Sequence, residues 1–237
     1  QTLGRFLVRY NYADVKKAFK PVDAWWTVTI ADPIAGRLTL FLANYTSITP
    51  NIVTILAFTL SFAAAFLFYQ ATPISLALGT LLFEIGFIFD CVDGKLARLK
   101  GLRSKQGEII DFLFDRLGFF LLLGGLMFGQ FRLYDNFEII IWGFFIIFLD
   151  NYINFISLYL KIEDKSSVTL SVRNIFGKTK ALLNQRRLAS FFTTVEVTQL
   201  LFFFTPLTTR IQLGFLFANF AYLLLTFYLL VKLKKVL

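Results

Sequence analysis

Long apolar runs constrain this chain more than any other feature of its sequence. Hydrophobic residues make up 57% of it, including 31 phenylalanines, whereas a soluble domain has about 45–50%. Six stretches are long enough to cross a hydrocarbon core about 30 Å thick. We therefore predict an all-α fold, a polytopic membrane helical bundle with six transmembrane helices. The predicted spans lie at about 50–70, 74–99, 106–129, 136–160, 188–207 and 210–231.

A shorter apolar run over residues 32–45 precedes the first predicted span, and Arg37 interrupts it. A charged run of this length is too short to span, so it predicts an N-terminal amphipathic helix on the membrane surface. Trp25 and Trp26 come just before it. We expect this pair to anchor the helix, because tryptophan is enriched at membrane interfaces.

The N-terminal end of the chain differs from the rest. It starts at Gln1 without a methionine, so we expect a trimmed chain, a processed chain or a fragment of something longer. Residues 1–31 are predicted to be a cytoplasmic segment or linker, and residues 32–237 to be the membrane domain.

Basic residues gather in every second connection between the predicted spans. The net charge is +9, and Lys and Arg are concentrated in the second and fourth connections and at the C-terminal end. The positive-inside rule then places both termini and these two loops in the cytoplasm. We therefore expect an integral protein of the cytoplasmic (inner) membrane, and the flanking position of the charge argues for lipid and against nucleic acid as its partner.

Four aspartates interrupt the apolar pattern around the second predicted connection. Asp90 and Asp93 are three residues apart, and Asp111 and Asp115 are four apart, so each pair shares one helix face. An antiparallel hairpin would bring the two faces together near the cytoplasmic boundary. Because clustered carboxylates repel one another, we predict bound divalent cations, Mg²⁺ or Mn²⁺ and two in number, as in two-metal phosphoryl chemistry. The chain has no histidine, so acid–base work falls to Asp, Glu, Lys or Tyr.

The spacing around these aspartates resembles a family signature. It has the form D-x2-D-G-x2-A-R-x8-G-x3-D-x3-D, which is that of the CDP-alcohol phosphotransferase family. The fixed positions here are Asp90, Asp93, Gly94, Ala97, Arg98, Gly107, Asp111 and Asp115.

The resemblance implies metal-dependent transfer of a substituted phosphate to an acceptor hydroxyl, with release of CMP. The donor would be CDP-diacylglycerol or a CDP-inositol-like molecule, and the acceptor an inositol phosphate or glycerol phosphate. Asp90, Asp93 and Asp111 are then metal ligands. Asp115 is the candidate general base and a further metal ligand, and the active site faces the cytoplasm. The family also implies a homodimer.

A second resemblance concerns the start of the first span. Residues 49–54 are similar to the TPNxVT element of the same family, which brings Asn51 and Thr54 to one face. The nucleotide-binding residues implied by both motifs are Asn51, Thr54, Asp90, Gly94, Ala97, Arg98 and Gly107.

Further polar residues in apolar surroundings are candidates for the acceptor side: Arg116, Asp150, Asn151, Arg186 and Arg187. Lys20-Pro21-Val22-Asp23, the helix after it and the TPN element resemble a subgroup that includes di-inositol-phosphate synthases. In that subgroup a cytidylyltransferase domain often precedes the membrane domain.

Two alternatives remain open at this point. An aspartate-rich membrane prenyltransferase would also hold a metal-bound diphosphate, although its acidic clusters usually lie on distant helices. A divalent-cation transporter would use the aspartates as a relay, although it would need polar residues along a path through the bilayer.

Overall fold

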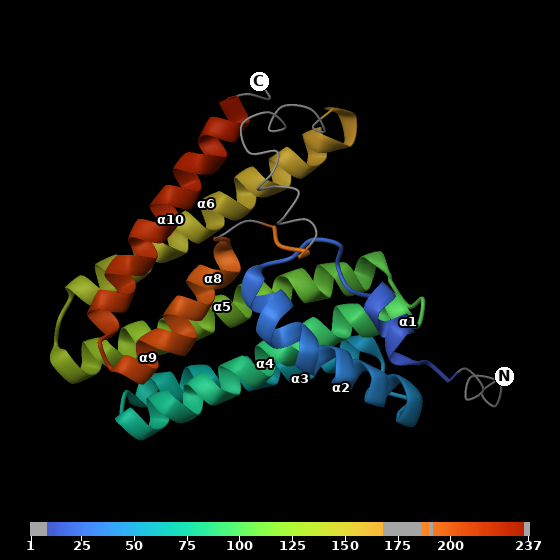
Figure 1. Ribbon diagram of the computed structural model, residues 1–237. Coiled ribbons are helices and arrows are strands. Elements are labelled where there is room, and N and C mark those ends of the chain that lie inside the picture. Colours follow the sequence, from blue (N-terminus) through green and yellow to red (C-terminus); the bar gives the residue numbers. More distant parts are fainter. Residues whose placement is uncertain (1–8, 168–185, 190–191, 235–237) are drawn as a thin grey trace.

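The computed structural model describes residues 9–167, 186–189 and 192–234, with side chains of residues 161–167 left aside. Every named element in this part is helical (Figure 1). The elements are α1 (Tyr12–Lys17), η2 (Thr27–Ala31), α2 (Asp32–Tyr45), α3 (Pro50–Gln70), α4 (Pro73–Leu99), α5 (Lys105–Tyr134), α6 (Glu138–Ser167), α8 (Thr194–Gln199), η3 (Leu200–Phe204), α9 (Thr205–Thr208) and α10 (Ile211–Lys234). The two η segments are π-helical.

Local signals in the sequence set the ends of the central helices. Proline occupies the first turn of both α3 and α4, where its missing N–H costs no hydrogen bond. Thr72 and Ser75 form a capping box at the start of α4. Gly101, with a φ of 65°, lies in the short turn that leads to α5. Ser104 caps α5 by accepting a hydrogen bond from the Gly107 backbone N–H at 3.0 Å.

Within the described part of the chain, four helices are long and apolar enough to cross a membrane, as expected of an integral membrane protein. Three of the predicted spans match them closely: α3, α4 and α10. The fourth is the stretch Glu138–Leu160 of α6. Helix α5 is long enough, but its first half carries the charges of the predicted site.

The fifth predicted span differs from what the structure shows. Helix begins at Thr194, where Thr193 and Glu196 form a capping box. Leu188, predicted to open a span, instead forms a β-bridge with Asp23. The helical stretch Thr194–Thr208 is about 22 Å long at 1.5 Å per residue, which is short for a bilayer core. The hydropathy pattern does not predict this β-bridge, because Asp23, the partner of Leu188, lies far away in the sequence.

The predicted helix over residues 32–45 is present as α2 with the same bounds, but the role expected of Trp26 was wrong. Its side chain is 5% exposed and packs against the rings of Phe203 and Phe204. Its indole N–H donates to Glu84 at 3.1 Å. A buried tryptophan that satisfies an interior carboxylate does not anchor a helix at the membrane interface.

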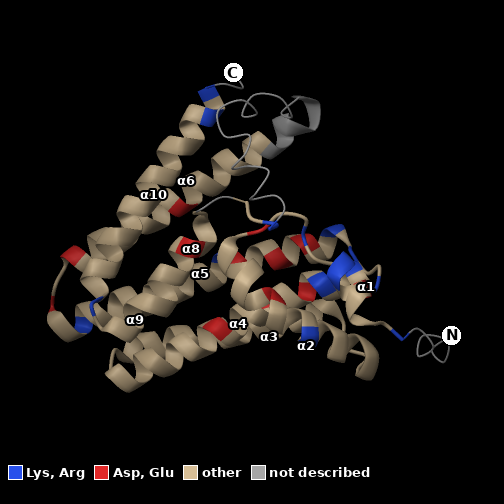
Figure 2. Ribbon diagram, viewed as in Figure 1, with Lys and Arg blue, Asp and Glu red and all other residues tan. Residues whose placement is uncertain are grey.

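The helices form two groups. Helices α3, α4 and α5 pack together, with α2 and α1 along the end of α4, while α6 and α10 pack against each other (Figure 1). A core that includes Phe68, Leu123, Phe202 and Phe215 connects the two groups through α8 and η3. Charged residues are concentrated near α1 and the facing ends of α4 and α5, so that region is where the polar site lies (Figure 2).

The close approach of α3 and α5 gives the first prediction. A Cβ added at Gly125 would clash with the backbone carbonyl of Ala65, whereas one at Gly124 would meet nothing within 4 Å. We expect Gly125→Ala to lower the melting temperature in detergent by several degrees, because neither backbone can move aside cheaply. The matched control, Gly124→Ala, should leave it unchanged or slightly higher. Equal melting temperatures for the two variants would contradict this packing.

Candidate active site

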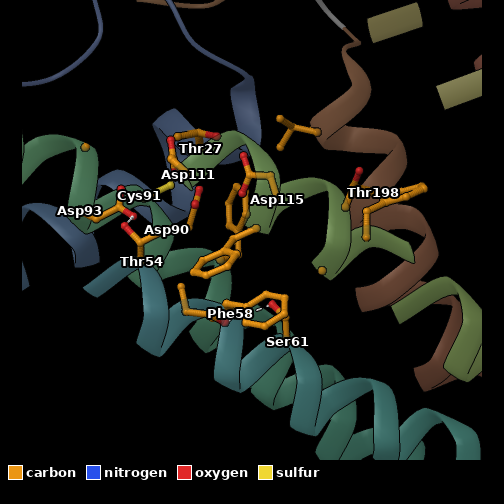
Figure 3. A pocket seen from close by; sticks show the side chains of 18 of the residues that line it. Thr27, Thr54, Phe58, Ser61, Asp90, Cys91, Asp93, Asp111, Asp115 and Thr198 are labelled. Carbon is orange, nitrogen blue, oxygen red and sulfur yellow. Dashed lines mark hydrogen bonds between the residues drawn. The ribbon is translucent and has the colours of Figure 1, made fainter. Parts of the chain in front are cut away.

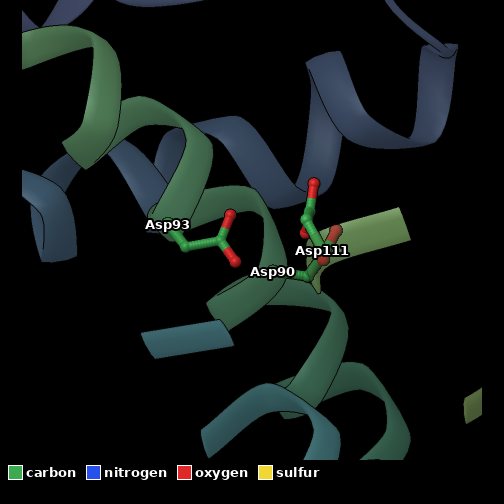
Figure 4. Close-up of side chains that lie close together, drawn as sticks. All are labelled: Asp90, Asp93 and Asp111. Atoms are coloured by element: carbon green, nitrogen blue, oxygen red, sulfur yellow. The ribbon is translucent and has the colours of Figure 1, made fainter. Parts of the chain in front are cut away.

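The predicted convergence of carboxylates is present, near the end of α4 and the start of α5. Asp90 and Asp93 project from α4 and Asp111 from α5, each offering an oxygen within 4.8 Å of the others (Figure 4). One oxygen of Asp111 is buried and has no hydrogen-bond partner among the described residues. An orphaned carboxylate oxygen beside two other carboxylates fits a hard divalent cation, which prefers oxygen ligands.

Asp115 is not part of that group of three but belongs to the same site. It lies one turn further along α5, lines the same cavity and comes close to the Asp90 carboxyl. Figure 3 shows it beside Asp90 and Asp111, facing into the cavity. It is therefore placed to meet a reacting group next to the cation site.

Thr54 orients one of the carboxylates. Its hydroxyl donates to Oδ2 of Asp93 at 2.5 Å, and both side chains are buried. A hydroxyl donor of this kind fixes the rotamer of a ligand carboxylate without competing for the oxygen that faces the ion. Thr54 is a predicted nucleotide contact, and the structure shows in addition that its hydroxyl bonds a predicted metal ligand.

A cavity of about 350 Å³ adjoins the carboxylates. Its polar end includes Lys20 and Arg98, and its opposite wall is apolar and aromatic. Phe58, labelled in Figure 3, forms part of that wall. Its ring stacks on that of Phe114 at a centroid distance of 4.6 Å. A cavity with a charged end and an aromatic wall suits a ligand that joins phosphate to a flat ring or an acyl group.

A buried ion-pair cluster holds the chain around this site. Lys95, inside the signature stretch, lies 2.7 Å from Oδ1 of Asp32, and Arg187 lies 2.9 Å from Oδ2 of the same residue. Arg187 also donates to the backbone carbonyl of Lys20 at 2.8 Å. This cluster fastens the segment before α2 and the chain after α6 to α4.

The predicted nucleotide residues divide into two sets. Thr54, Asp90, Gly94 and Arg98 line the cavity, whereas Asn51, Ala97 and Gly107 are not in its lining. Arg98 also donates from Nε to the Ala18 carbonyl, so part of its guanidinium supports the N-terminal segment.

The predicted acceptor residues also divide. Arg116 and Asp150 line the cavity and are paired with each other. Arg187 belongs to the Asp32 cluster, Arg186 is exposed, and Asn151 donates to the carbonyl of Ile147 at 2.8 Å. None of these last three is in the cavity lining described here.

Several lining residues carried no functional assignment from the sequence. Lys20, Asp23 and Thr27 come from the segment before α2, and Ser61 from α3. The stretch Lys20–Asp23 had been noted as a family-like element, but no single-sequence signal places a segment before the first helix over a site formed by the next hairpin.

Together these features define a helical membrane protein with a carboxylate cluster that fits a divalent cation, at the edge of a partly aromatic cavity. Residues 47–231 match the profile of the CDP-alcohol phosphatidyltransferase family. The chain belongs to that family.

Named relatives agree with this assignment. The chain is 38% identical over 85 residues to archaetidylinositol phosphate synthase of Pyrococcus horikoshii, covering 34% of this chain and 44% of that protein. It is 28% identical over 168 residues to the bifunctional IPC transferase and DIPP synthase of Aquifex aeolicus, covering 69% and 37%. The chain thus spans less than half the length of these curated relatives.

The fold resembles that of phosphatidylinositol phosphate synthase of Mycobacterium tuberculosis. The structure of that protein with CDP-DAG bound has a TM-score of 0.60 and 20% identity, over 85% of this chain and 92% of that one. Its complex with manganese and citrate has a TM-score of 0.54 and 21% identity, over 85% and 87%. At this identity the likeness shows the fold.

The hydrogen bond from Thr54 gives the second prediction. Thr54→Val keeps the side-chain shape but removes the donor to Asp93, so we expect Mn²⁺ affinity to fall about 10–100-fold. The affinity is measured from the electron paramagnetic resonance of free Mn²⁺. Thr59→Val is the matched control on the same helix, because among the residues that the structure describes the Thr59 hydroxyl bonds only the Ile55 carbonyl. Unchanged affinity in Thr54→Val would remove Thr54 from the cation site.

Proposed function

We propose that this protein transfers a substituted phosphate from a CDP-alcohol to the hydroxyl of an acceptor alcohol, releasing CMP. One observation carries the proposal: the four signature aspartates meet at the charged end of a cavity in a chain of this family. The donor class follows from the family, and the aromatic wall offers a surface for the cytosine ring or the lipid part of the donor.

Asp90, Asp93 and Asp111, with Asp115, would hold the divalent metal, Mg²⁺ or Mn²⁺ and two ions in our proposal. Bound there, it supplies charge that offsets the diphosphate oxygens of the donor. The orphaned Asp111 oxygen and the hydroxyl-fixed Asp93 support this assignment. The neighbouring mycobacterial structure contains manganese, which makes Mn²⁺ a suitable probe.

Asp115 is our candidate for the general base. Its carboxylate accepts the proton of the acceptor hydroxyl as that oxygen forms a bond to the β-phosphorus of the donor. The bond from the β-phosphorus to the bridging oxygen breaks, and CMP leaves with the electron pair. Lys20 and Arg98, at the polar end of the cavity, stabilise the phosphate charge, and Gly94 leaves room for the donor beside them.

We propose an acceptor of the inositol phosphate type, with glycerol phosphate as the second candidate. Two relatives carry names of inositol-linked synthases, and the cavity offers basic groups besides those at the cation site. The prenyltransferase alternative would leave the Gly94, Ala97 and Arg98 element without a role. The transporter alternative has less support, because the four signature aspartates lie together near the end of α4 and the start of α5 and do not follow a path through the bundle.

The membrane arrangement is also part of the proposal. Six crossings follow if α5 and the α8–α9 stretch are embedded along with the four apolar helices. In this arrangement α2 lies on the membrane surface, residues 1–31 form a cytoplasmic segment, and residues 32–237 form the membrane domain. The basic connections then place the active site and both termini in the cytoplasm of an inner-membrane protein. We further propose a homodimer, by resemblance to the family.

The third prediction tests the reaction class. Purified protein should release CMP from CDP-diacylglycerol or CDP-inositol only when a divalent metal and an acceptor are both present. Addition of EDTA should abolish release, and Mn²⁺ or Mg²⁺ should restore it, because the carboxylate cluster needs the cation to bind diphosphate. Radiolabelled donor is screened against inositol phosphate, glycerol phosphate and serine. Release that persists in EDTA, or metal flux into liposomes without CMP, would contradict the proposal.

The fourth prediction tests the base. Asp115→Asn should lower kcat about 10²–10⁴-fold, the usual contribution of a positioned base, while Mn²⁺ binding is retained at the other three carboxylates. Asp135→Asn is the control, since Asp135 is an exposed residue at the C-terminal cap of α5, and it should keep full turnover. Wild-type kcat in Asp115→Asn would refute the base assignment. Loss of Mn²⁺ binding along with turnover would make Asp115 a metal ligand first.

A further inference from the structure

A second buried polar cluster, separate from the Asp32 cluster, adjoins the same cavity. It centres on Asp150 of α6, which is 2% exposed. Arg116 of α5 lies 2.5 Å from Oδ2 of Asp150. Asn154 donates to the same oxygen at 3.2 Å, and the Tyr222 hydroxyl donates to Oδ1 at 3.3 Å. Asp150 therefore receives donors from three helices.

The hydrogen bonds to Asp150 fix the position of the Arg116 guanidinium. A buried carboxylate with three donors has little freedom to rotate, and separating it from its cationic partner would leave an uncompensated charge. Tyr222 is fully buried and reaches Asp150 from α10. The packing of α6 against α10 therefore sets the position of the Asp150 carboxylate. The Arg116 side chain stays 25% exposed and lines the cavity.

The rest of the Arg116 guanidinium is free to bind a ligand. Among the described residues no other side chain or carbonyl accepts a hydrogen bond from it, and its Nε is buried without a partner. Arg116 directly follows Asp115 in the chain, and Asp115 lies close to Asp90. Without Asp150, Coulomb attraction would draw the guanidinium toward these carboxylates. The ion pair with Asp150 holds one nitrogen of the guanidinium at α6 instead.

We propose that Asp150 and Tyr222 are positioning residues, which hold Arg116 at the cavity wall so that its open donors bind the phosphate monoester of a phosphorylated acceptor. This rests on the proposed transferase function and assigns roles within it. Guanidinium is suited to the task because its planar fork matches two phosphate oxygens at once. A phosphate held beside Asp115 would place the hydroxyls of the same acceptor near the base.

The assignment changes the role expected of Asp150 from the sequence. A carboxylate that contacted the acceptor directly would face the cavity with open oxygens, whereas both oxygens of Asp150 already accept hydrogen bonds. A negative charge next to an acceptor phosphate would also repel it. Asp150 therefore acts on acceptor binding by holding Arg116 in place.

Two conservative variants test the proposal, each with a matched control. Asp150→Asn keeps the size and removes the charge, and Tyr222→Phe removes one hydroxyl. Glu138→Gln controls for charge removal on α6, because Glu138 is exposed near the start of that helix. Tyr228→Phe controls for hydroxyl loss on α10, because Tyr228 is 60% exposed. Binding of glycerol phosphate and inositol phosphate is measured by calorimetry on the full chain in detergent, and KM and kcat are measured alongside.

In Asp150→Asn we expect affinity for both phosphorylated acceptors to fall about tenfold or more, the usual effect of losing a charge-assisted hydrogen bond. KM for these acceptors should rise to match, while KM for the CDP-donor and Mn²⁺ affinity stay at wild-type values. Tyr222→Phe should lower the affinity for the phosphorylated acceptors by a smaller factor. Both control variants should keep the wild-type affinity and kinetics. Free glycerol and inositol should bind equally to all variants.

Unchanged phosphate affinity in both variants would overturn the proposal, as would an equal loss of donor, metal and acceptor binding, which marks a purely structural role. If Asp150→Asn does not fold, Tyr222→Phe, which lacks only a hydroxyl, carries the test. The calorimetric binding measurement also distinguishes a failure of this proposal from a failure of the transferase function on which it rests. A wild-type protein that bound the phosphates through Arg116 but never released CMP would refute the transferase and leave the phosphate site in place.

Discussion

The rest of the structure depends on one costly arrangement, the gathering of like charges at the end of an apolar helical hairpin. Asp90, Asp93 and Asp111 bring oxygens within 4.8 Å of one another, and carboxylates this close repel strongly where the surroundings are poor in water. Hydrogen bonding offsets part of this cost, as at Asp93, but leaves an Asp111 oxygen without a partner in the described part of the chain. A bound cation would remove the remaining repulsion between the carboxylates that α4 and α5, each packed against α3, bring together.

Two buried ion pairs connect this hairpin to the rest of the chain. Lys95 of α4 pairs with Asp32 at the start of α2, and Arg116 of α5 pairs with Asp150 of α6. Lys95 follows Gly94 at a position that the signature leaves variable, and Arg116 directly follows Asp115, the last residue of the signature. The signature thus supplies the aspartates of the predicted cation site, and two residues outside its fixed positions fasten that site to the surrounding helices. Breaking either pair would leave a buried charge uncompensated.

Much of this was predictable from local sequence. The bounds of α2 and α3 and the pairing of aspartates on two neighbouring helices followed from apolar run length, the proline at the start of α3 and helical spacing. The errors have a common cause. Leu188 was expected to open a span but pairs with Asp23, and Trp26 was expected at the interface but bonds Glu84. In each case a partner that is distant in the sequence outweighed a local preference.

The sequence by itself determined that the chain is a helical membrane protein with an acidic cluster at one end of a hairpin, because run length and residue spacing are local properties. Only the tertiary structure decided which predicted ligands reach the cavity. It brought Thr54 to Asp93, separated Asn151, Arg186 and Arg187 from the cavity lining, and engaged both oxygens of Asp150. The reason is physical: a polar side chain in an apolar bundle takes the nearest partner that satisfies it, and helix packing alone sets which partner is nearest.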